Sequence, residues 1–387
     1  MDKYKVDDFV SSGCGDIIHM CKRRNNSKRD FLFVNTAQGK HVPVRPSKVY
    51  DMVEQMYKIS YMDLFDKRNI LVVAFAETAT ALGELYYNYA RRYYKTLRPL
   101  DVVSFVTTTR ADLSDKSEYE PLCFSEEHSH AAAQKLYVDP SLKIDTVVFI
   151  EDEITTGNTI LHLVAKLKEV HKHIKNFYVL SVCNWQTEEC QKRFAEKNVK
   201  ALALYHGYLK DLDAKMDMEE EQLKVYSPSG CKVHKNFLGK YHRVNTNIDN
   251  TKIQENDSLA YDIENYVKDT FDLGDSDTVE VVGTEEFMGL PLKIAAMLEE
   301  RGISTYFHAT TRSPIVPSKD CVITNGAMLT SAYDIDRQTY LYDVSNIYAT
   351  HVVVFTEGEP NNNFVEEITK LYIDQGVRAD NMMIVAL

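Results

Sequence analysis

The chain of 387 residues is long enough for two or three domains of ordinary size. Hydrophobic residues make up 44% of it and charged residues 26%, a balance that is typical of a globular protein and excludes disorder over most of its length. The formal net charge of −12 argues against a protein that neutralises the phosphates of a nucleic acid, but it is compatible with a local basic pocket for a small anion.

The N-terminal segment and the cysteines predict the compartment. MDKYKVDDF lacks the basic region and apolar stretch of a secretory signal, and no apolar run approaches the 18 residues of a spanning helix. The seven cysteines are scattered singly, which is typical of reduced thiols. We therefore expect a cytoplasmic protein with no membrane and no nucleic-acid partner.

Four continuous apolar runs of strand length lie in the first part of the chain, at residues 70–76, 102–108, 146–150 and 177–182. Strands that are apolar on both faces are typical of a parallel sheet. The stretches between them repeat apolar residues at helical spacing. This alternation predicts an α/β fold with a doubly wound parallel sheet.

Residues 206–258 are charged and polar, and they include SPSG and NTNIDN. The α/β alternation resumes with TVEVVG at 278–283 and ends with the apolar run MMIVAL at 382–387. We therefore predict a first domain over residues 1–205, a connecting segment over 206–258, and a second α/β domain over 259–387.

Three segments of the first part resemble three of the second, in the same order. Three pairs mark the offsets: Glu77 and Glu286 differ by 209 positions, Arg110 and Arg312 by 202, and Glu151 and Glu357 by 206. Chance likeness among buried strands is one explanation. The preserved order and small drift favour an internal duplication.

The most specific segment is VVFIEDEITTGNT at residues 147–159. A strand ends in the acids Glu151 and Asp152, and a Thr/Gly turn then begins a helix, so that hydroxyls and backbone N–H groups could cradle a phosphate. The turn consists of Thr155, Thr156, Gly157, Asn158 and Thr159. The acids suit the vicinal hydroxyls of a ribose, directly or through hydrated Mg²⁺. The alternative is a surface acid pair followed by an N-capping threonine.

This segment resembles the phosphoribosyl-pyrophosphate (PRPP) motif of type I phosphoribosyltransferases, although Glu153 stands where that family has an apolar residue. More of the chain is similar to the orotate phosphoribosyltransferase-like proteins linked to tellurium-resistance-type gene clusters. The shared segments are FLFVNTAQGKHVPVRP (31–46), AFAETATALG (74–83), TTTR (107–110) and EEHSHA (126–131). Those proteins carry a C-terminal domain named for Thr-Arg-Ser-Pro, which is present here in TTRSP (310–314) after GTEEFMGLP (283–291).

The resemblance covers nearly the whole chain and implies a type I phosphoribosyltransferase fold with an N-terminal hood over about residues 1–68. It implies a Mg²⁺-dependent transfer of 5-phosphoribosyl from PRPP to a nucleobase-like acceptor, with release of pyrophosphate, and by analogy a homodimer. Glu151 and Asp152 would then hold the ribose and, through water, Mg²⁺.

The other site residues follow two strands and the hood. Glu77 and Thr78 follow a strand where the family holds pyrophosphate through backbone groups; the alternative is a capped helix N-terminus. Arg110 ends the next strand, and residues 111–130 form a long polar connection of the kind that serves as a lid. This lid contributes the candidates Lys116, His128 and His130, although a His-x-His pair on a loop is equally compatible with adventitious metal binding or with no role. Lys40, in the Gly-Lys element of the hood, would face the phosphates or the incoming nucleophile; the alternative is a solvated lysine in a hairpin.

The second domain lacks a Thr-Thr-Gly loop after Glu359, so it resembles a degenerate phosphoribosyltransferase without a phosphate cradle. Its strand ends predict a polar crevice that receives the acceptor, a product or part of the first domain. The crevice residues are Glu285, Glu286, Thr311, Arg312 and Ser313. An alternative function is a non-catalytic PRPP-binding regulator or scaffold. The sequence does not identify the acceptor.

Overall fold

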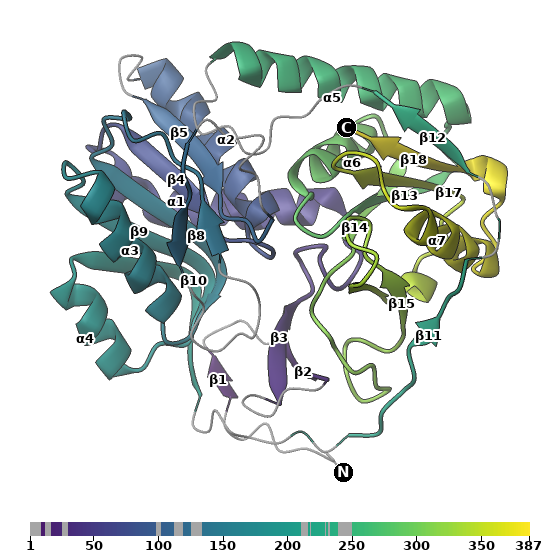
Figure 1. Cartoon of the computed structure of the whole chain (residues 1–387), viewed down its shortest axis with the longest axis horizontal. Helices are drawn as coiled ribbons and strands as arrows, with labels where there is room; N and C mark the ends of the chain where they lie inside the picture. Colours follow the sequence, from purple (N-terminus) through teal and green to yellow (C-terminus); the bar gives the residue numbers. More distant parts are fainter. Residues whose placement is uncertain are drawn as a thin grey trace.

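The computed structural model describes residues 9–11, 17–24, 30–97, 102–111, 119–124, 134–209, 216, 218–228, 230, 233–238 and 250–387. These residues form two α/β halves, which lie at the left and right of Figure 1: a first half up to residue 209 and a second half from residue 218. No helix among them is long and apolar enough to cross a membrane.

The first half is built on a six-stranded sheet. In spatial order its strands are β1 (Phe9–Ser11), β10 (Val199–Leu209), β9 (Asn176–Asn184), β8 (Thr146–Ile154), β4 (Ile70–Ala74) and β5 (Val103–Thr107), all parallel except β1. Helices α1 (Pro46–Leu64) and α2 (Thr80–Leu97) cover one face. Helices α3 (Asn158–Val170) and α4 (Glu188–Glu196) contribute to the core on the other. The predicted doubly wound sheet is confirmed.

The second half repeats this plan with a parallel five-stranded sheet. Its order is β12 (His234–Phe237), β18 (Met382–Ala386), β17 (His351–Thr356), β13 (Thr278–Gly283) and β14 (Ser304–Ala309). Helices α5 (Asn250–Phe271) and α6 (Gly289–Glu300) pack on one face. The other carries α7 (Asn362–Asp374) and a small sheet of β11 (Lys224–Val225), β15 (Gly326–Thr330) and β16 (Gln338–Tyr342). The short helices η1 (Val344–Asn346) and η2 (Ala379–Asn381) precede β17 and β18.

The pairing of the strands is the same in both halves, as a duplication predicts. In the first, Ile70 pairs with Val103 and Thr146, and in the second, Val279 pairs with Thr305 and His351. The fifth strand differs, because β10 follows the other strands in the chain whereas β12 precedes them.

The register corrects one detail of the sequence comparison. Val73 pairs with Phe149, and the equivalent Val282 pairs with Val354. Counting forward three residues from each partner places Asp152, and not Glu151, level with Glu357. The offset of 206 between Glu151 and Glu357 was therefore wrong by one residue.

A hairpin of β2 (Ile18–Lys22) and β3 (Phe31–Asn35), called the hood hairpin below, lies between the two halves at the bottom of Figure 1. Arg23 forms a backbone bridge to Ile315, and Val44 bridges Phe307 of β14. Helix α1, which the predicted hood included, instead packs on the first sheet. A second hairpin, β6 (Leu122–Phe124) with β7 (Gln134–Leu136), follows β5.

The two halves share one hydrophobic core, which contains residues of α1 and α2 together with residues of α5 and α6. The first turn of α1 contains no acidic residue. Glu299 of α6 supplies the missing carboxylate, because it accepts hydrogen bonds from the Ser47 N–H (2.7 Å) and from Arg45 Nε (2.9 Å). A carboxylate at this end of a helix is stabilising. The halves are therefore packed as one unit.

A substitution of Gly39 tests how closely the N-terminal segment packs against the second half. Gly39 has a φ of +76°, and a Cβ there would lie 2.4 Å from the ring of Phe307 in the second half. Gly302, with a φ of +87° and open space around it, is the matched control. We expect Gly302→Ala to cost about 1–2 kcal/mol from backbone strain. Gly39→Ala should cost about 1–3 kcal/mol more, because the added methyl group forces the hood away from β14. Free energies of unfolding in urea measure both values, and equal losses would contradict the close contact.

Candidate active site

The carboxyl ends of β4 and β8 meet where the strand order of the first sheet reverses, which is where open α/β sheets bind ligands. The hood hairpin covers this edge, and a small pocket, partly open to solvent, lies between them. Its lining comprises Ile18, Phe33, Asn35, Gln38 and His41 from the N-terminal segment, and Asp152, Glu153 and Cys183 from β8 and β9. The pocket thus combines apolar and polar side chains at the end of β8, where the sequence predicts a ligand site.

Glu153 has a defined role in this pocket although it departs from the family motif. Its carboxylate accepts a hydrogen bond from Trp185 Nε1 (3.2 Å), and its N–H donates to Asp152 Oδ1 (2.9 Å). Trp185 stacks on Phe33 with ring centroids 4.7 Å apart. Trp185 is therefore a packing residue that also orients an acid of the pocket.

His41 is buried in the wall of the pocket, and its Nε2 has no hydrogen-bond partner in the described part of the chain. Burial lowers the pKa of His41 well below its usual 6.5, and the charge of Lys40 adds to this. The imidazole is therefore neutral at pH 7, and its surroundings disfavour the protonated form.

The predicted phosphate loop leads directly into α3. Its N-cap is Gly157 in the left-handed conformation (φ 70°), which has no side chain to occupy the helix N-terminus. A Cβ at Gly157 would lie 2.3 Å from the ring of Phe194, so packing behind the loop also requires glycine. Thr155, Thr156 and Thr159 are only partly buried.

Arg193 of α4 supports this loop from behind. Its Nη1 donates to Asn158 Oδ1 (2.7 Å) and its Nη2 to the carbonyl oxygen of Thr156 (3.2 Å). No motif in the sequence indicates this role, because α4 lies 30 residues further along the chain.

The equivalent helix of the second half, α7, has its own cap. Asn361 accepts a hydrogen bond from the Phe364 N–H (2.9 Å), and its amide donates to the carbonyl oxygen of Ser331. The side chain of Asn361 thus takes a position that is open at Gly157. This agrees with the sequence, which lacks a Thr-Thr-Gly loop here.

Glu77 follows β4 and is buried among three cationic residues. Its Oε1 lies 3.3 Å from Lys40 Nζ and accepts the Arg312 N–H (3.1 Å), while its Oε2 lies 3.7 Å from Arg110 Nη1. Burial by itself raises the pKa of Glu77, but Lys40, Arg110 and Arg312 outweigh it and lower that pKa to about 2. The carboxylate of Glu77 is therefore committed to these cations, and the backbone of residues 77–78 is left as the predicted contact for pyrophosphate.

Glu286, the equivalent of Glu77, makes the reciprocal contact. It accepts hydrogen bonds from Thr109 Oγ1 (2.7 Å) and from the Arg110 N–H (3.1 Å). Glu77, after β4 of the first half, thus accepts the N–H of Arg312, which follows β14 of the second half. Glu286, after β13 of the second half, accepts the N–H of Arg110, which follows β5 of the first half. Such an exchange is the hallmark of a two-fold interface.

The five predicted crevice residues come together at the carboxyl ends of β13 and β14. Arg312 Nε and Nη2 lie 2.6 and 2.5 Å from Glu285 Oε2, and Ser331 donates to the other oxygen. Burial raises the pKa of Glu285 although Arg312 opposes this. Thr311 Oγ1 accepts the Ser313 N–H at 3.0 Å. The crevice residues therefore bind one another and the first half.

Lys116, His128 and His130 lie outside the described residues, so their predicted roles stay untested. The residue pair that flanks that connection is described: Thr109 forms a backbone bridge to Lys135 of β7. Thr311 forms the equivalent bridge to Tyr340 of β16. The hairpin β15–β16 is thus the counterpart of β6–β7.

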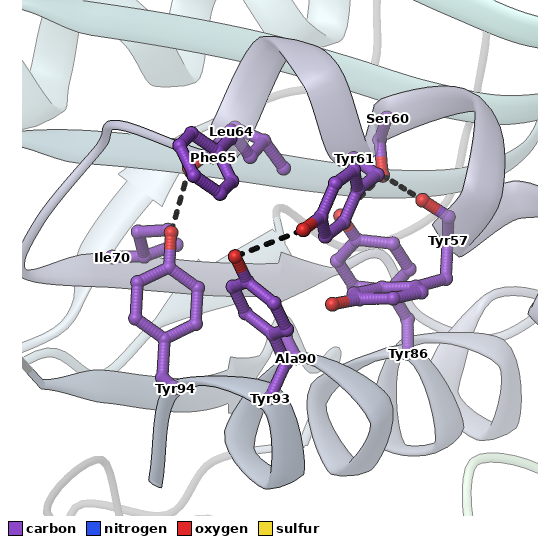
Figure 2. A pocket seen from close by; sticks show the side chains of 10 residues that line it. All are labelled: Tyr57, Ser60, Tyr61, Leu64, Phe65, Ile70, Tyr86, Ala90, Tyr93 and Tyr94. Atoms are coloured by element: carbon purple, nitrogen blue, oxygen red, sulfur yellow. Dashed lines mark hydrogen bonds between the residues drawn. The ribbon is translucent and has the colours of Figure 1, made fainter. Parts of the chain in front are cut away.

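A second pocket lies between α1 and α2 near Ile70, at the amino end of β4 (Figure 2). Half of its lining residues are tyrosines, and hydrogen bonds join Ser60 to Tyr86 (2.7 Å) and Tyr61 to Tyr93 (3.0 Å). It lies at the opposite end of the strand from Glu77 and takes no part in the site. No group of three or more His, Cys, Asp or Glu among the described residues gathers as a metal site.

Comparison with protein families gives two matches. Residues 17–206 match the family PRTase_2, described as phosphoribosyl transferase, and residues 249–372 match the TRSP domain that lies C-terminal to PRTase_2. The chain therefore belongs to the phosphoribosyltransferases that carry a C-terminal TRSP domain, and it is an enzyme of that class. No curated protein matches it.

Several solved structures are similar to parts of the chain. Adenine phosphoribosyltransferase from Trypanosoma brucei, in complex with AMP, pyrophosphate and ribose-5-phosphate, is 11% identical, with a TM-score of 0.35 over 54% of this chain and 84% of that one. The Leishmania donovani enzyme is 12% identical, with a TM-score of 0.36 over 49% and 76%. Orotate phosphoribosyltransferase from Aeropyrum pernix is 14% identical, with a TM-score of 0.27 over 43% and 74%.

The pKa of Glu77 leads to a prediction about acid stability. Because it is about 2 in the folded chain and 4.5 ordinarily, the charged carboxylate stabilises the fold fully above pH 4.5, and this contribution is lost as the pH falls toward 2. The shift corresponds to a contribution on the order of 3 kcal/mol. We expect Glu77→Gln to lower the free energy of unfolding at pH 6, and the difference from the unaltered chain to shrink with acid. Urea unfolding between pH 6 and pH 3 measures this. Parallel pH profiles would show that Glu77 carries no such contribution.

Proposed function

We propose that the enzyme transfers the 5-phosphoribosyl group of PRPP to a ring nitrogen of a heteroaromatic acceptor and releases pyrophosphate. The observation that carries the proposal is the juxtaposition, at one sheet edge, of an uncapped helix N-terminus at Gly157 and the pocket that Asp152 lines. A helix N-terminus of this kind favours a phosphate group. The pocket accepts the second reactant beside it.

Each part of PRPP then has a partner. The loop 155–159 binds the 5′-phosphate through N–H groups and hydroxyls, and Glu151 and Asp152 bind the ribose hydroxyls. The backbone of Glu77 and Thr78, with Arg110 and Lys40, lies on the pyrophosphate side. Positive charge there stabilises the leaving group as negative charge develops on it.

Mg²⁺ fits the residues at the end of β8. This ion prefers oxygen ligands, keeps several waters, and uses one or two carboxylates together with substrate phosphates. Glu151 and Asp152 are only partly buried and offer such oxygens to a hydrated ion. When bound, the ion would supply positive charge against the pyrophosphate.

The pocket also indicates the class of acceptor. Phe33 offers an aromatic surface, and Asn35, Gln38 and His41 offer polar groups along the wall. A flat ring with a hydrogen-bonding edge suits this combination. The neutral imidazole of His41 is suited to form a hydrogen bond with the polar edge of such a ring. The homodimer and the cytoplasmic location expected above stay predictions.

Pyrophosphate release from PRPP, measured with a panel of nucleobases and related heterocycles, tests the proposal. We expect Asp152→Asn to lower turnover by at least about tenfold, since each lost carboxylate contact is worth more than about 1.4 kcal/mol. Glu357→Gln is the matched control, because Glu357 takes the equivalent position in the second half and should leave turnover unchanged. PRPP binding by calorimetry without release with any acceptor would favour the regulatory alternative. Absence of binding would contradict both.

Arg193 provides a separate prediction about the phosphate loop. We expect Arg193→Ala to weaken PRPP binding by about three- to tenfold, since a charged hydrogen bond that positions Asn158 is lost. Turnover at saturating PRPP should change less, because Arg193 lies behind the loop. Lys192→Ala, at an exposed position of the same helix, is the control. Equal PRPP affinities for the two variants would show that the loop needs no support from α4.

A further inference from the structure

Cys21 and Cys321 lie 300 residues apart in sequence and meet between the hood hairpin and the second half. Their sulfur atoms are 2.7 Å apart, and neither is bonded in a disulfide. A disulfide needs a separation of about 2.05 Å, so a shift of less than about one ångström would join them. The proximity follows from the fold, because Cys21 lies in β2 and Cys321 in the segment between β14 and β15.

The surroundings hold the two sulfurs in place. Next to Cys21, the Val316 N–H donates to the carbonyl oxygen of Lys22 (2.9 Å) and the Arg24 N–H to that of Pro314 (2.7 Å). Cys21 is fully buried in a small apolar cluster, whereas Cys321 is partly exposed. The cluster consists of Cys21, Val34, Ile315, Ile323, Tyr340 and Tyr342. Reagents from solvent therefore reach Cys321 first.

The two thiols also differ in acidity. The hydrogen bond from Cys21 lowers the pKa of Cys321, and the same contact raises the pKa of Cys21. A thiolate is the reactive form of cysteine. Cys321, the accessible member of the pair, is thus the nucleophile, and Cys21, the buried member, is the second thiol next to it.

We propose that Cys21 and Cys321 form a reversible redox site, which peroxide oxidises to a disulfide that ties the hood hairpin to the second half. The Cys321 thiolate attacks one oxygen of hydrogen peroxide, the O–O bond breaks, and sulfenic acid and hydroxide form. The sulfur of Cys21 then attacks the sulfenic sulfur, and the oxygen leaves as water with the proton of the Cys21 thiol. The two sulfurs give up two electrons, which reduce the peroxide. A dithiol then reduces the disulfide by exchange, is itself oxidised to a disulfide, and restores both protein thiols.

The site is distinct from the phosphoribosyl chemistry and connects to it through the fold. Strand β2 also supplies Ile18 to the acceptor pocket, so the disulfide would fix one wall of that pocket to the second half. In a reducing compartment disulfides of this kind are usually transient and redox-sensing. Oxidation of the two thiols would therefore join the hood hairpin covalently to the second half.

The experiment treats the full chain with hydrogen peroxide, alkylates the remaining thiols under denaturing conditions, and maps the peptides by mass spectrometry. We expect a Cys21–Cys321 cross-link, the loss of alkylation at both of these cysteines, and a higher melting temperature that dithiothreitol reverses. Cys21→Ser should leave a sulfenic acid at Cys321 that dimedone traps, and Cys321→Ser should give neither product at Cys21. Cys123→Ser, which removes an exposed cysteine, is the control and should still form the cross-link.

Two outcomes would overturn the proposal. One is alkylation of Cys21 and Cys321 in full after peroxide has consumed the thiol of Cys123. The other is oxidation of Cys321 to a sulfinic acid without a cross-link in the unaltered chain. Neither readout requires PRPP, so failure of the proposed transfer reaction would leave this test unaffected.

Discussion

The arrangement of the molecule depends on the contacts that the buried carboxylate of Glu77 makes. This carboxylate brings together Lys40 from the N-terminal segment, Arg110 from the first half and the Arg312 N–H from the second. Removing one partner from a buried charge cluster typically costs about 3–5 kcal/mol. The hood, the loop after β4 and the second half are therefore held to one another, and the candidate site takes its shape from all three.

The reciprocal contact at Glu286 gives this arrangement an approximate two-fold symmetry. A duplicated chain can dock its halves as identical subunits dock in a dimer, with equivalent residues exchanged across the interface. The two halves then diverge in the helix that follows their third strand. Helix α3 has Gly157 as its N-cap and no side-chain cap, whereas Asn361 caps α7. The second half thus keeps the docking surface of the fold without a glycine-capped helix N-terminus.

Buried strands and strand-end motifs could be predicted from the sequence, because continuous apolar runs and a Thr-Thr-Gly turn are local signals. The one-residue error between Glu151 and Glu357 has a physical cause: runs of valine and phenylalanine look alike in either register, and only the hydrogen bonds to β4 and β13 distinguish them. The contacts of Glu286 and Arg193 could not be predicted, since they depend on how separate elements dock. The burial of His41 could not be predicted either, because it depends on how the hood hairpin packs.

The packing of the two halves against each other also explains which contacts the TTRSP segment of the second half makes. The Thr310 hydroxyl accepts the Glu285 N–H (3.1 Å), the Arg312 N–H donates to Glu77, and the carbonyl oxygen of Pro314 accepts the Arg24 N–H from the end of the hood hairpin. Polar contacts of this segment thus reach the second half, the first half and the hood. A segment whose backbone and side chains are engaged in this way has few groups left for a ligand. The segment that contains the Thr-Arg-Ser-Pro motif therefore binds Glu77 and the hood hairpin, and so it holds the second half against both.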